Sequence, residues 1–169
     1  MELPTARRIK VMAAAAFLIA ASAVPAAAAQ SAQVLDVPLA WRNVNSGKCL
    51  EIRGDSRENG ALANQWECND SSTQKWYGFI YGPTTLVNAN SGKCLEIRGD
   101  ATENGATANQ WECNGSSTQL WELTQPGDGW WQFRNLNSGK CLEIRGDATG
   151  NGATANQWEC NSSLTQRWR

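Results

Sequence analysis

Asn45-Ser-Gly-Lys-Cys-Leu-Glu-Ile-Arg-Gly-Asp55 occurs three times in the chain, letter for letter, at residues 45–55, 90–100 and 137–147. Each copy continues through Asn-Gly-Ala into Ala-Asn-Gln-Trp-Glu-Cys-Asn and closes on Thr-Gln-x-Trp. The first cysteines of successive copies lie 45 and 47 residues apart. A period of this regularity predicts three copies of one structural unit that together bury a shared core.

Each copy is expected to form short β-strands separated by turns. Apolar and polar residues alternate along Cys49-Leu-Glu-Ile-Arg53, so one strand face should carry Leu50 and Ile52 and the other Glu51. Asn-Ser-Gly, Gly-Asp and Asn-Gly are typical turn sequences. About four strands per repeat and about twelve in all predict an all-β fold. Three equal four-stranded units fit a β-trefoil, which is a six-stranded barrel capped by three hairpins.

The Gln-x-Trp motifs are expected to place one tryptophan per repeat in the shared core, namely Trp76, Trp121 and Trp168. One position fits the alternation poorly, because it turns Gln65 inward, where a barrel rarely holds glutamine. Either the strand bulges there, or the Gln65 side chain bonds backbone groups beneath the hairpin. The sequence leaves both explanations open.

The first 29 residues are expected to be a secretory signal peptide. Arg7, Arg8 and Lys10 form a basic segment, residues 11–24 are apolar and alanine-rich, and three alanines stand at 27–29 after Pro25. The alternative is a membrane anchor, since the apolar run is about the spanning minimum in length, but Pro25 interrupts it. We therefore expect a secreted, extracellular and monomeric domain over residues 30–169 that stands alone without an attached enzyme.

Charge excludes two classes of partner. The chain has 15 basic and 16 acidic residues; without Arg7, Arg8, Lys10 and Glu2 these become 12 and 15, a net charge of −3. Nucleic-acid binding needs a basic footprint, and anionic membranes attract basic clusters. We expect neither nucleic acid nor membrane as a partner once the signal is removed.

The six cysteines indicate a disulfide framework in a secreted chain. Threefold symmetry leaves either one bridge inside each repeat or a ring of bridges between repeats. The first arrangement closes shorter loops and is the one we expect, with a spacing of 19 residues each time. The expected bridges are Cys49–Cys68, Cys94–Cys113 and Cys141–Cys160. A zinc site is not expected, because the chain has no histidine and no Cys-x-x-Cys, and no cofactor or other metal is expected.

Three sets of Ser-Gly-Lys-Cys-Leu, Asn-Gly-Ala, Trp-x-Cys and Gln-x-Trp, in phase with three cysteine pairs, resemble the ricin B-type lectins, including bacterial carbohydrate-binding modules built on the same trefoil. The resemblance covers about residues 37–169, with repeats of about 38–82, 83–128 and 129–169. It implies a secreted, non-catalytic lectin whose usual ligands are galactose-type or xylan-type sugars.

The resemblance also implies one shallow sugar pocket per repeat, with a carboxylate, an aromatic platform and amides. The expected carbohydrate-binding residues are Glu51, Asn64, Trp66, Thr73 and Gln74 in the first repeat, Glu96, Asn109, Trp111, Thr118 and Gln119 in the second, and Glu143, Asn156, Trp158, Thr165 and Gln166 in the third. Carboxylate and amide groups match sugar hydroxyls as acceptors and donors, and an indole matches the C–H face of the ring.

Two departures bear on these pockets. The family usually has Asp where Glu51 and its two equivalents stand, and Asn where Thr73 and its equivalents stand. Either the sugar specificity has shifted uniformly, or the pockets bind poorly. Plainer readings are that Arg53 simply neutralises Glu51 and that Trp66 packs over the disulfide. The Arg-Gly-Asp tripeptide at 53–55 is explained by a turn that ends the strand.

Catalysis is not expected. Without histidine or a free thiol the usual nucleophilic triads are excluded, and the three symmetry-related glutamates are spread around the axis rather than paired. A trefoil protease inhibitor would need one long exposed loop, and the longest unmatched stretch, Thr124–Trp130, is short. An inhibitor or a non-binding structural protein therefore remains the alternative to a lectin.

Overall fold

The structure is a computed structural model that describes residues 37–80 and 82–169. The predicted signal peptide at residues 1–29 lies outside the described residues. The described strands are β1 (Leu39–Ala40), β2 (Cys49–Ile52), β3 (Ala63–Trp66), β4 (Lys75–Tyr77), β5 (Pro83–Thr84), β6 (Val87–Asn88), β7 (Cys94–Ile97), β8 (Ala108–Trp111), β9 (Trp121–Gly127), β10 (Trp130–Asn135), β11 (Cys141–Ile144) and β12 (Ala155–Trp158). Six single 3₁₀ turns complete the pattern: η1 (Arg53–Asp55), η2 (Ser72–Gln74), η3 (Arg98–Asp100), η4 (Ser117–Gln119), η5 (Arg145–Asp147) and η6 (Leu164–Gln166).

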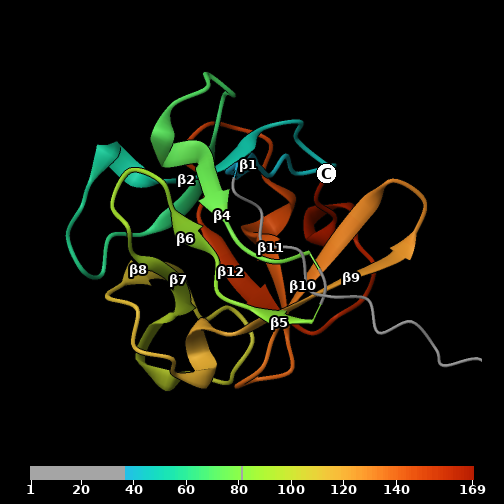
Figure 1. Cartoon of the computed structure of the whole chain (residues 1–169). Helices are drawn as coiled ribbons and strands as arrows, with labels where there is room; N and C mark the ends of the chain where they lie inside the picture. The colour runs from blue at the N-terminus through green and yellow to red at the C-terminus, as the bar shows by residue number, and fades with distance from the viewer. Residues whose placement is uncertain (1–36, 81) are drawn as a thin grey trace, which may run out of the picture. The chain divides into compact units, whose positions relative to one another are not determined.

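Antiparallel pairing closes six stretches of chain into a barrel, and Figure 1 labels β1, β4, β5, β6, β9 and β10 among them. β1 pairs with β4, β4 with β6, β5 with β9 and β9 with β10, always antiparallel. β5 and β6 are two pieces of one stretch, residues 83–88, which therefore joins β4 on one side to β9 on the other. Bridges from Trp168 to Asn43 and to Trp131 close the ring. This is the all-β trefoil barrel that the repeats predict.

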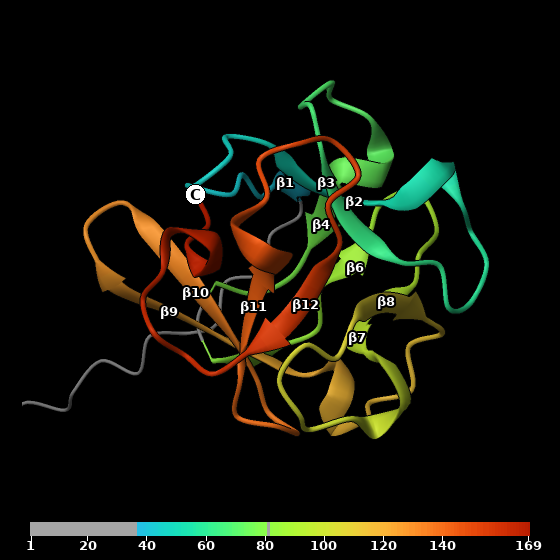
Figure 2. The ribbon, with the colours of Figure 1, turned by 180° about the vertical axis from the view of Figure 1, so that it is seen from behind.

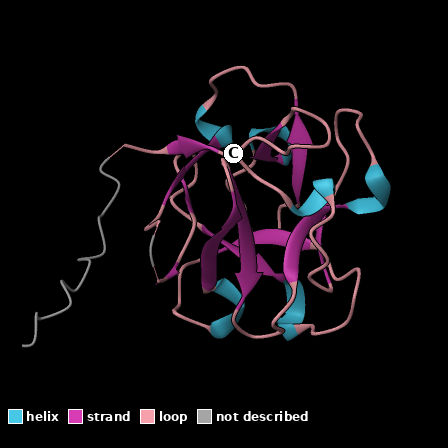
Figure 3. Cartoon of the chain, turned by 90° about the vertical axis from the view of Figure 1, so that its right-hand side faces the viewer, coloured by secondary structure: helices cyan, strands magenta, loops and turns pink. Residues whose placement is uncertain are grey.

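Three hairpins, β2–β3, β7–β8 and β11–β12, cap the barrel and surround a common centre (Figure 2). Their registers are identical: the first cysteine lies opposite the exposed tryptophan, and the glutamate lies opposite the asparagine. The 3₁₀ turns lie around the outside of the strands (Figure 3). Identical sequence thus gives identical hairpins three times.

The core is built as the Gln-x-Trp motifs predict. Trp76, Trp121 and Trp168 are fully buried among the leucine and isoleucine side chains of the hairpins. Each indole N–H must find an acceptor inside the core, and each donates to the backbone oxygen of a hairpin leucine, at 3.1, 3.0 and 3.2 Å. Every hairpin is therefore fixed to the barrel by one hydrogen bond from the core tryptophan of its own repeat.

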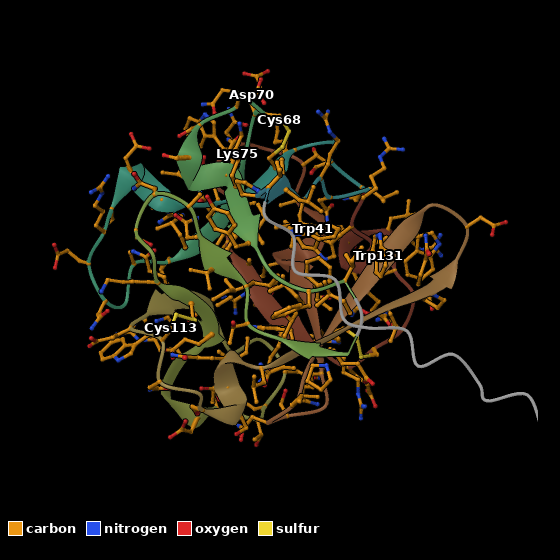
Figure 4. The ribbon with its side chains drawn as sticks, in the orientation of Figure 1. Trp41, Cys68, Asp70, Lys75, Cys113 and Trp131 are labelled. Atoms are coloured by element: carbon orange, nitrogen blue, oxygen red, sulfur yellow. A yellow bond between two sulfur atoms is a disulfide. The ribbon has the colours of Figure 1, made fainter. Side chains whose placement is uncertain are left out.

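The three disulfides lie inside the repeats, as expected: Cys49–Cys68, Cys94–Cys113 and Cys141–Cys160. No free cysteine occurs among the described residues. The bridge carrying Cys68 and the bridge carrying Cys113 lie on different sides of the barrel (Figure 4). Each one ties the strand that carries the glutamate to the segment that follows the exposed tryptophan.

Strict threefold symmetry ends at the barrel strands. The first repeat has four described strands, the second five and the third three, rather than four in each. The stretch Thr124–Trp130 forms the exposed end of the β9–β10 hairpin, whose two strands pair with each other. Beside this hairpin Trp41 meets Trp131 edge-on, with ring centroids 6.3 Å apart (Figure 4).

The structure also decides between the two explanations for Gln65. β2 and β3 pair in continuous register, so the strand does not bulge. The buried Gln65 side chain instead bonds two backbone carbonyls of the third repeat, and it accepts a hydrogen bond from Ser46 Oγ.

Candidate functional site

Three equivalent surface pockets occur, one beside each hairpin. Their volumes are about 520, 420 and 530 Å³ in the first, second and third repeats. In all three the lining includes the glutamate of the hairpin, the Arg-Gly-Asp turn, the exposed tryptophan and a buried threonine. The equivalent placement follows from the identical hairpin register.

The carboxylate at the back of the first pocket belongs to Glu51, which is only 8% exposed. Gln74 Nε2 donates to Glu51 Oε2 at 3.0 Å and to the backbone oxygen of Glu67 at 2.9 Å. Gln74 Oε1 accepts from the backbone N–H of Asn69 at 3.0 Å. All the polar atoms of the Gln74 side chain are thus engaged, and its role is to hold Glu51 in position.

Burial sets the ionisation of this carboxylate. Desolvation raises the pKa of Glu51 above its usual value, and the hydrogen bond from Gln74 opposes the rise. Desolvation likewise raises the pKa of Glu143, again opposed by hydrogen bonds from the glutamine and asparagine of its own repeat. The pockets therefore hold their carboxylates as partly desolvated acceptors.

The aromatic wall is an exposed tryptophan. Trp66, Trp111 and Trp158 are 42, 42 and 41% exposed, whereas the core tryptophans are fully buried. Each projects from the end of the second strand of its hairpin. An indole with one free face beside a carboxylate offers both an apolar surface and a hydrogen-bond acceptor to the same ligand.

The Arg-Gly-Asp turn also lines the pocket. Gly54 and Asp55 have φ of 65° and 53°, so two successive left-handed residues reverse the chain; glycine and aspartate tolerate this conformation well. Arg53 Nη2 donates to the backbone oxygen of Gly152 at 2.8 Å. The ion pair found among the described residues is Arg134–Glu122, so Arg53 does not neutralise Glu51 by a salt bridge.

The neighbouring repeat contributes to the first pocket. Gly152, from the third repeat, lines the pocket of the first. A Cβ at Gly152 would lie 3.8 Å from Trp66 Cζ3, and the same spacing joins Gly60 to Trp111 and Gly105 to Trp158. The tryptophan of every pocket therefore packs over the Asn-Gly turn of the preceding repeat in the ring.

We call this contact between a hairpin and the preceding Asn-Gly turn a seam; the first seam joins β3 to residues 148–152. Gln65 Nε2 donates to the oxygens of Ala148 and Gly150, each at 2.9 Å. The backbone N–H of Glu67 donates to Asn151 Oδ1 at 3.0 Å. Equivalent bonds form the seam of β8 with residues 56–60 and that of β12 with residues 101–105.

The structure brings together most of the residues expected at each site. Glu51, Trp66 and Thr73 line the first pocket, as do their equivalents Glu96, Trp111, Thr118, Glu143, Trp158 and Thr165 in the others. Asn64 lines the first pocket but is only 1% exposed, and Asn109 and Asn156 are fully buried. Gln74, Gln119 and Gln166 are buried behind the glutamates that they hold.

Sequence reasoning missed the Arg-Gly-Asp turn and Gly152 as parts of the pocket. Both are present in the repeats as turn sequences, but a repeated motif gives no information on which neighbour it meets. The threonines are held by their own turn: Thr73 Oγ1 and Ser71 Oγ share a hydrogen bond of 2.9 Å.

The fold and its three equivalent pockets define a class, the β-trefoils of the lectin type. A family model described as ricin-type β-trefoil lectin domain-like matches residues 40–85, 78–158 and 119–169. The chain belongs to this ricin-type β-trefoil lectin family. No curated protein matches the chain in sequence.

Solved structures share the fold. The designed threefold-symmetric protein ThreeFoil is 29% identical, with a TM-score of 0.76 over 79% of this chain and 96% of its own. An exo-β-1,3-galactanase from Clostridium thermocellum is 31% identical, with a TM-score of 0.76 over 79% of this chain and 30% of its own. A ricin B-like lectin from Macrolepiota procera, in complex with lactose, is 18% identical, with a TM-score of 0.66 over 78% and 91%. The last likeness concerns the fold alone.

Within residues 37–80 and 82–169, no helix has the length and hydropathy that a membrane crossing requires.

Proposed function

We propose that the protein is a secreted, non-catalytic lectin that binds carbohydrate at three equivalent pockets. The observation that carries this proposal is the repeated pairing of a fixed, buried carboxylate with a half-exposed indole. The carboxylate accepts hydrogen bonds from sugar hydroxyls, while the indole contacts the C–H face of the ring. Galactose-type sugars are the first candidates and xylan-type sugars the second, since lactose and a galactan-degrading enzyme appear among the solved relatives.

Each pocket alone should bind weakly. The sites are open, and a hydrogen bond exposed to water contributes only about 1 kcal/mol net, so a millimolar dissociation constant, about −4 kcal/mol, is expected. Three pockets on one monomer can engage a branched or surface glycan together. Linked binding then strengthens the apparent affinity by about a hundredfold or more without a new contact.

The carboxylate geometry favours binding over hydrolysis. In the second pocket Glu96 Oε1 accepts from Asn109 Nδ2 at 3.2 Å, and Glu96 Oε2 accepts from Gln119 Nε2 at 3.0 Å. A glycosidase acid must carry a proton on one of these oxygens, and both already accept hydrogen bonds. Asp100, the second carboxylate in the lining of this pocket, therefore has no proton-donating carboxyl group with which to form a catalytic pair.

The test is a series of Trp66→Ala, Trp111→Ala and Trp158→Ala, singly and combined, with Tyr77→Ala as the control. Tyr77 is 41% exposed, like the pocket tryptophans, but lies outside all three pockets. We expect each single change to remove one site from the stoichiometry for lactose or xylobiose, and the second change to reduce retention on immobilised polysaccharide steeply.

Tyr77→Ala should change neither stoichiometry nor retention. A folded triple variant that binds as tightly as the unaltered protein would overturn the pocket assignment. Release of reducing ends from the polysaccharide by the unaltered protein would overturn the non-catalytic part of the proposal. A glycan array with the same protein identifies the sugar.

A further inference from the structure

Three buried asparagines meet where the hairpins surround the centre of the cap. Asn64 in β3, Asn109 in β8 and Asn156 in β12 are 1, 0 and 0% exposed. Isolated β-bridges pair Asn64 with Thr154, Asn109 with Leu62 and Asn156 with Thr107. Each bridge partner lies two residues before the asparagine of its own strand, so the three segments form a closed triangle in which every segment contacts both others.

This pairing places the three amides on one face of the triangle. Residues opposite each other in an antiparallel pair project to the same side, as do residues two apart on one strand. Asn64, Thr154 and Asn156 therefore share a face, and the same holds around the ring. Diagonal neighbours in such ladders lie about 7–8 Å apart, which lets three asparagine oxygens converge on one small ligand at the centre.

For two of the three amides, hydrogen bonds determine which end faces the centre. Asn109 Nδ2 donates to Glu96 Oε1 at 3.2 Å, and Asn156 Nδ2 donates to Glu143 Oε1 at 3.4 Å. A carboxylate only accepts, so the amide nitrogen must face the pocket. The Oδ1 atom is then directed away from the pocket.

These oxygens have no partner of their own. Among the described residues, Oδ1 of Asn64, Asn109 and Asn156 accepts no hydrogen bond, and each of these atoms exposes less than 1 Å². Buried acceptors are paired in nearly all native structures, because an unmet one costs its desolvation free energy. The same unmet atom in all three repeats indicates a shared ligand and not an isolated packing defect.

We propose that the Oδ1 atoms of Asn64, Asn109 and Asn156 bind one hard cation, Na⁺ or Ca²⁺, on the threefold axis. Amide oxygens are ligands that hard cations accept, at about 2.3–2.6 Å for Ca²⁺. The carboxylates next to the asparagines make the surroundings favourable for positive charge. The described residues contain no group of three or more His, Cys, Asp or Glu side chains that could hold a metal, so amide oxygens form this site.

The cation would connect the three pockets. It fixes the asparagines, and Asn109 and Asn156 in turn donate to the pocket glutamates. The site stands on the strand pairing and the unmet oxygens, and it does not depend on the proposed sugar binding.

The test compares the unaltered protein with Asn64→Leu. The Asn64 amide makes no hydrogen bond to any described residue, so leucine, which has a similar shape, removes one ligand without breaking a bond. Tm is measured after chelation and exchange into choline chloride, and again in NaCl or CaCl₂ at constant ionic strength. We expect Na⁺ or Ca²⁺ to raise Tm of the unaltered protein by several degrees through preferential binding to the folded state, and to leave Asn64→Leu unchanged.

Asn59→Leu is the matched control. It removes the hydrogen bond from the Glu112 N–H to Asn59 Oδ1, 3.0 Å long, in the second seam, so it should lower Tm equally in every salt and keep the cation response. Crystals soaked in Rb⁺ or Sr²⁺ should show an anomalous peak bonded to all three Oδ1 atoms. The proposal is overturned if Tm of the unaltered protein ignores cation identity, if Asn64→Leu is more stable in every salt, or if the centre holds only a water.

Discussion

The seams between repeats make a specific prediction about Gln65→Leu. This side chain is fully buried and makes three hydrogen bonds, two donated to Ala148 and Gly150 and one accepted from Ser46. Leucine fills nearly the same volume but leaves three polar groups unmet. At about 1 kcal/mol per bond the loss approaches 3 kcal/mol, and water reaching the exposed turn of Gly150 reduces it to about 2–3 kcal/mol.

Urea unfolding with the disulfides intact measures this loss. With a slope of about 1–3 kcal/mol per molar urea, the midpoint should fall by about 1–2 M. Gln110→Leu and Gln157→Leu should give nearly the same shift, because their bonds are the same. Gln125→Leu, at an exposed position in β9, is the control and should stay within about 0.5 kcal/mol. If Gln65→Leu shifts the midpoint no further than Gln125→Leu, the glutamines do not hold the seams.

Three more outcomes are expected. Burial raises the pKa of Glu51 and Glu143 above 4.5, so protonation of these carboxylates favours the folded state. Their contribution to the free energy of unfolding is fully present below about pH 4.5 and is lost as the pH rises through the raised pKa. Glu51→Gln with Glu143→Gln should therefore flatten the pH dependence of Tm and weaken sugar binding about tenfold or more at each altered pocket; an unchanged pH profile would contradict the assignment. Replacing Cys49 and Cys68 by serine should lower the free energy of unfolding by about 3 kcal/mol, checked by denaturant unfolding, and a much smaller loss would count against the bridge as a stabilising link. Mass measurement of the secreted protein should give a chain that starts near Gln30, whereas an intact N-terminus in the membrane fraction would indicate an anchor.

The fold could be predicted from the sequence because three letter-for-letter copies of one motif restrict the possible folds to those with threefold internal symmetry. Hydrophobic alternation in Cys49–Ile52 gave the hairpin strand, and Gln-x-Trp gave the core tryptophan. The cysteine spacing gave the bridges once the shorter loops were preferred. All these features act within one repeat, where sequence distance and spatial distance agree.

The sites were less accessible to prediction because they are built between repeats. Alternation predicted that Asn64 lies on the pocket side of its strand, and it does. Alternation did not predict that the neighbouring strands bury this side chain. The repeated motif could not show that the Trp66 ring packs against Gly152. The two residues are 86 positions apart and belong to different copies of the repeat. Gln74 was expected among the ligands but lies behind Glu51, because its side chain is used up by Glu51, Glu67 and Asn69.

The identity of the three seams has a consequence for how the chain finds its fold. Gln65 bonds the carbonyls of Ala148 and Gly150, yet the loops at 56–58 and 101–103 offer the same acceptors to the other two glutamines. Side-chain chemistry cannot distinguish the correct loop from the other two, so the cyclic order is selected by the lengths of the connecting segments. At high concentration a repeat of a second molecule meets the same acceptors, and the natural error of this architecture is a domain-swapped dimer in which every seam is chemically correct.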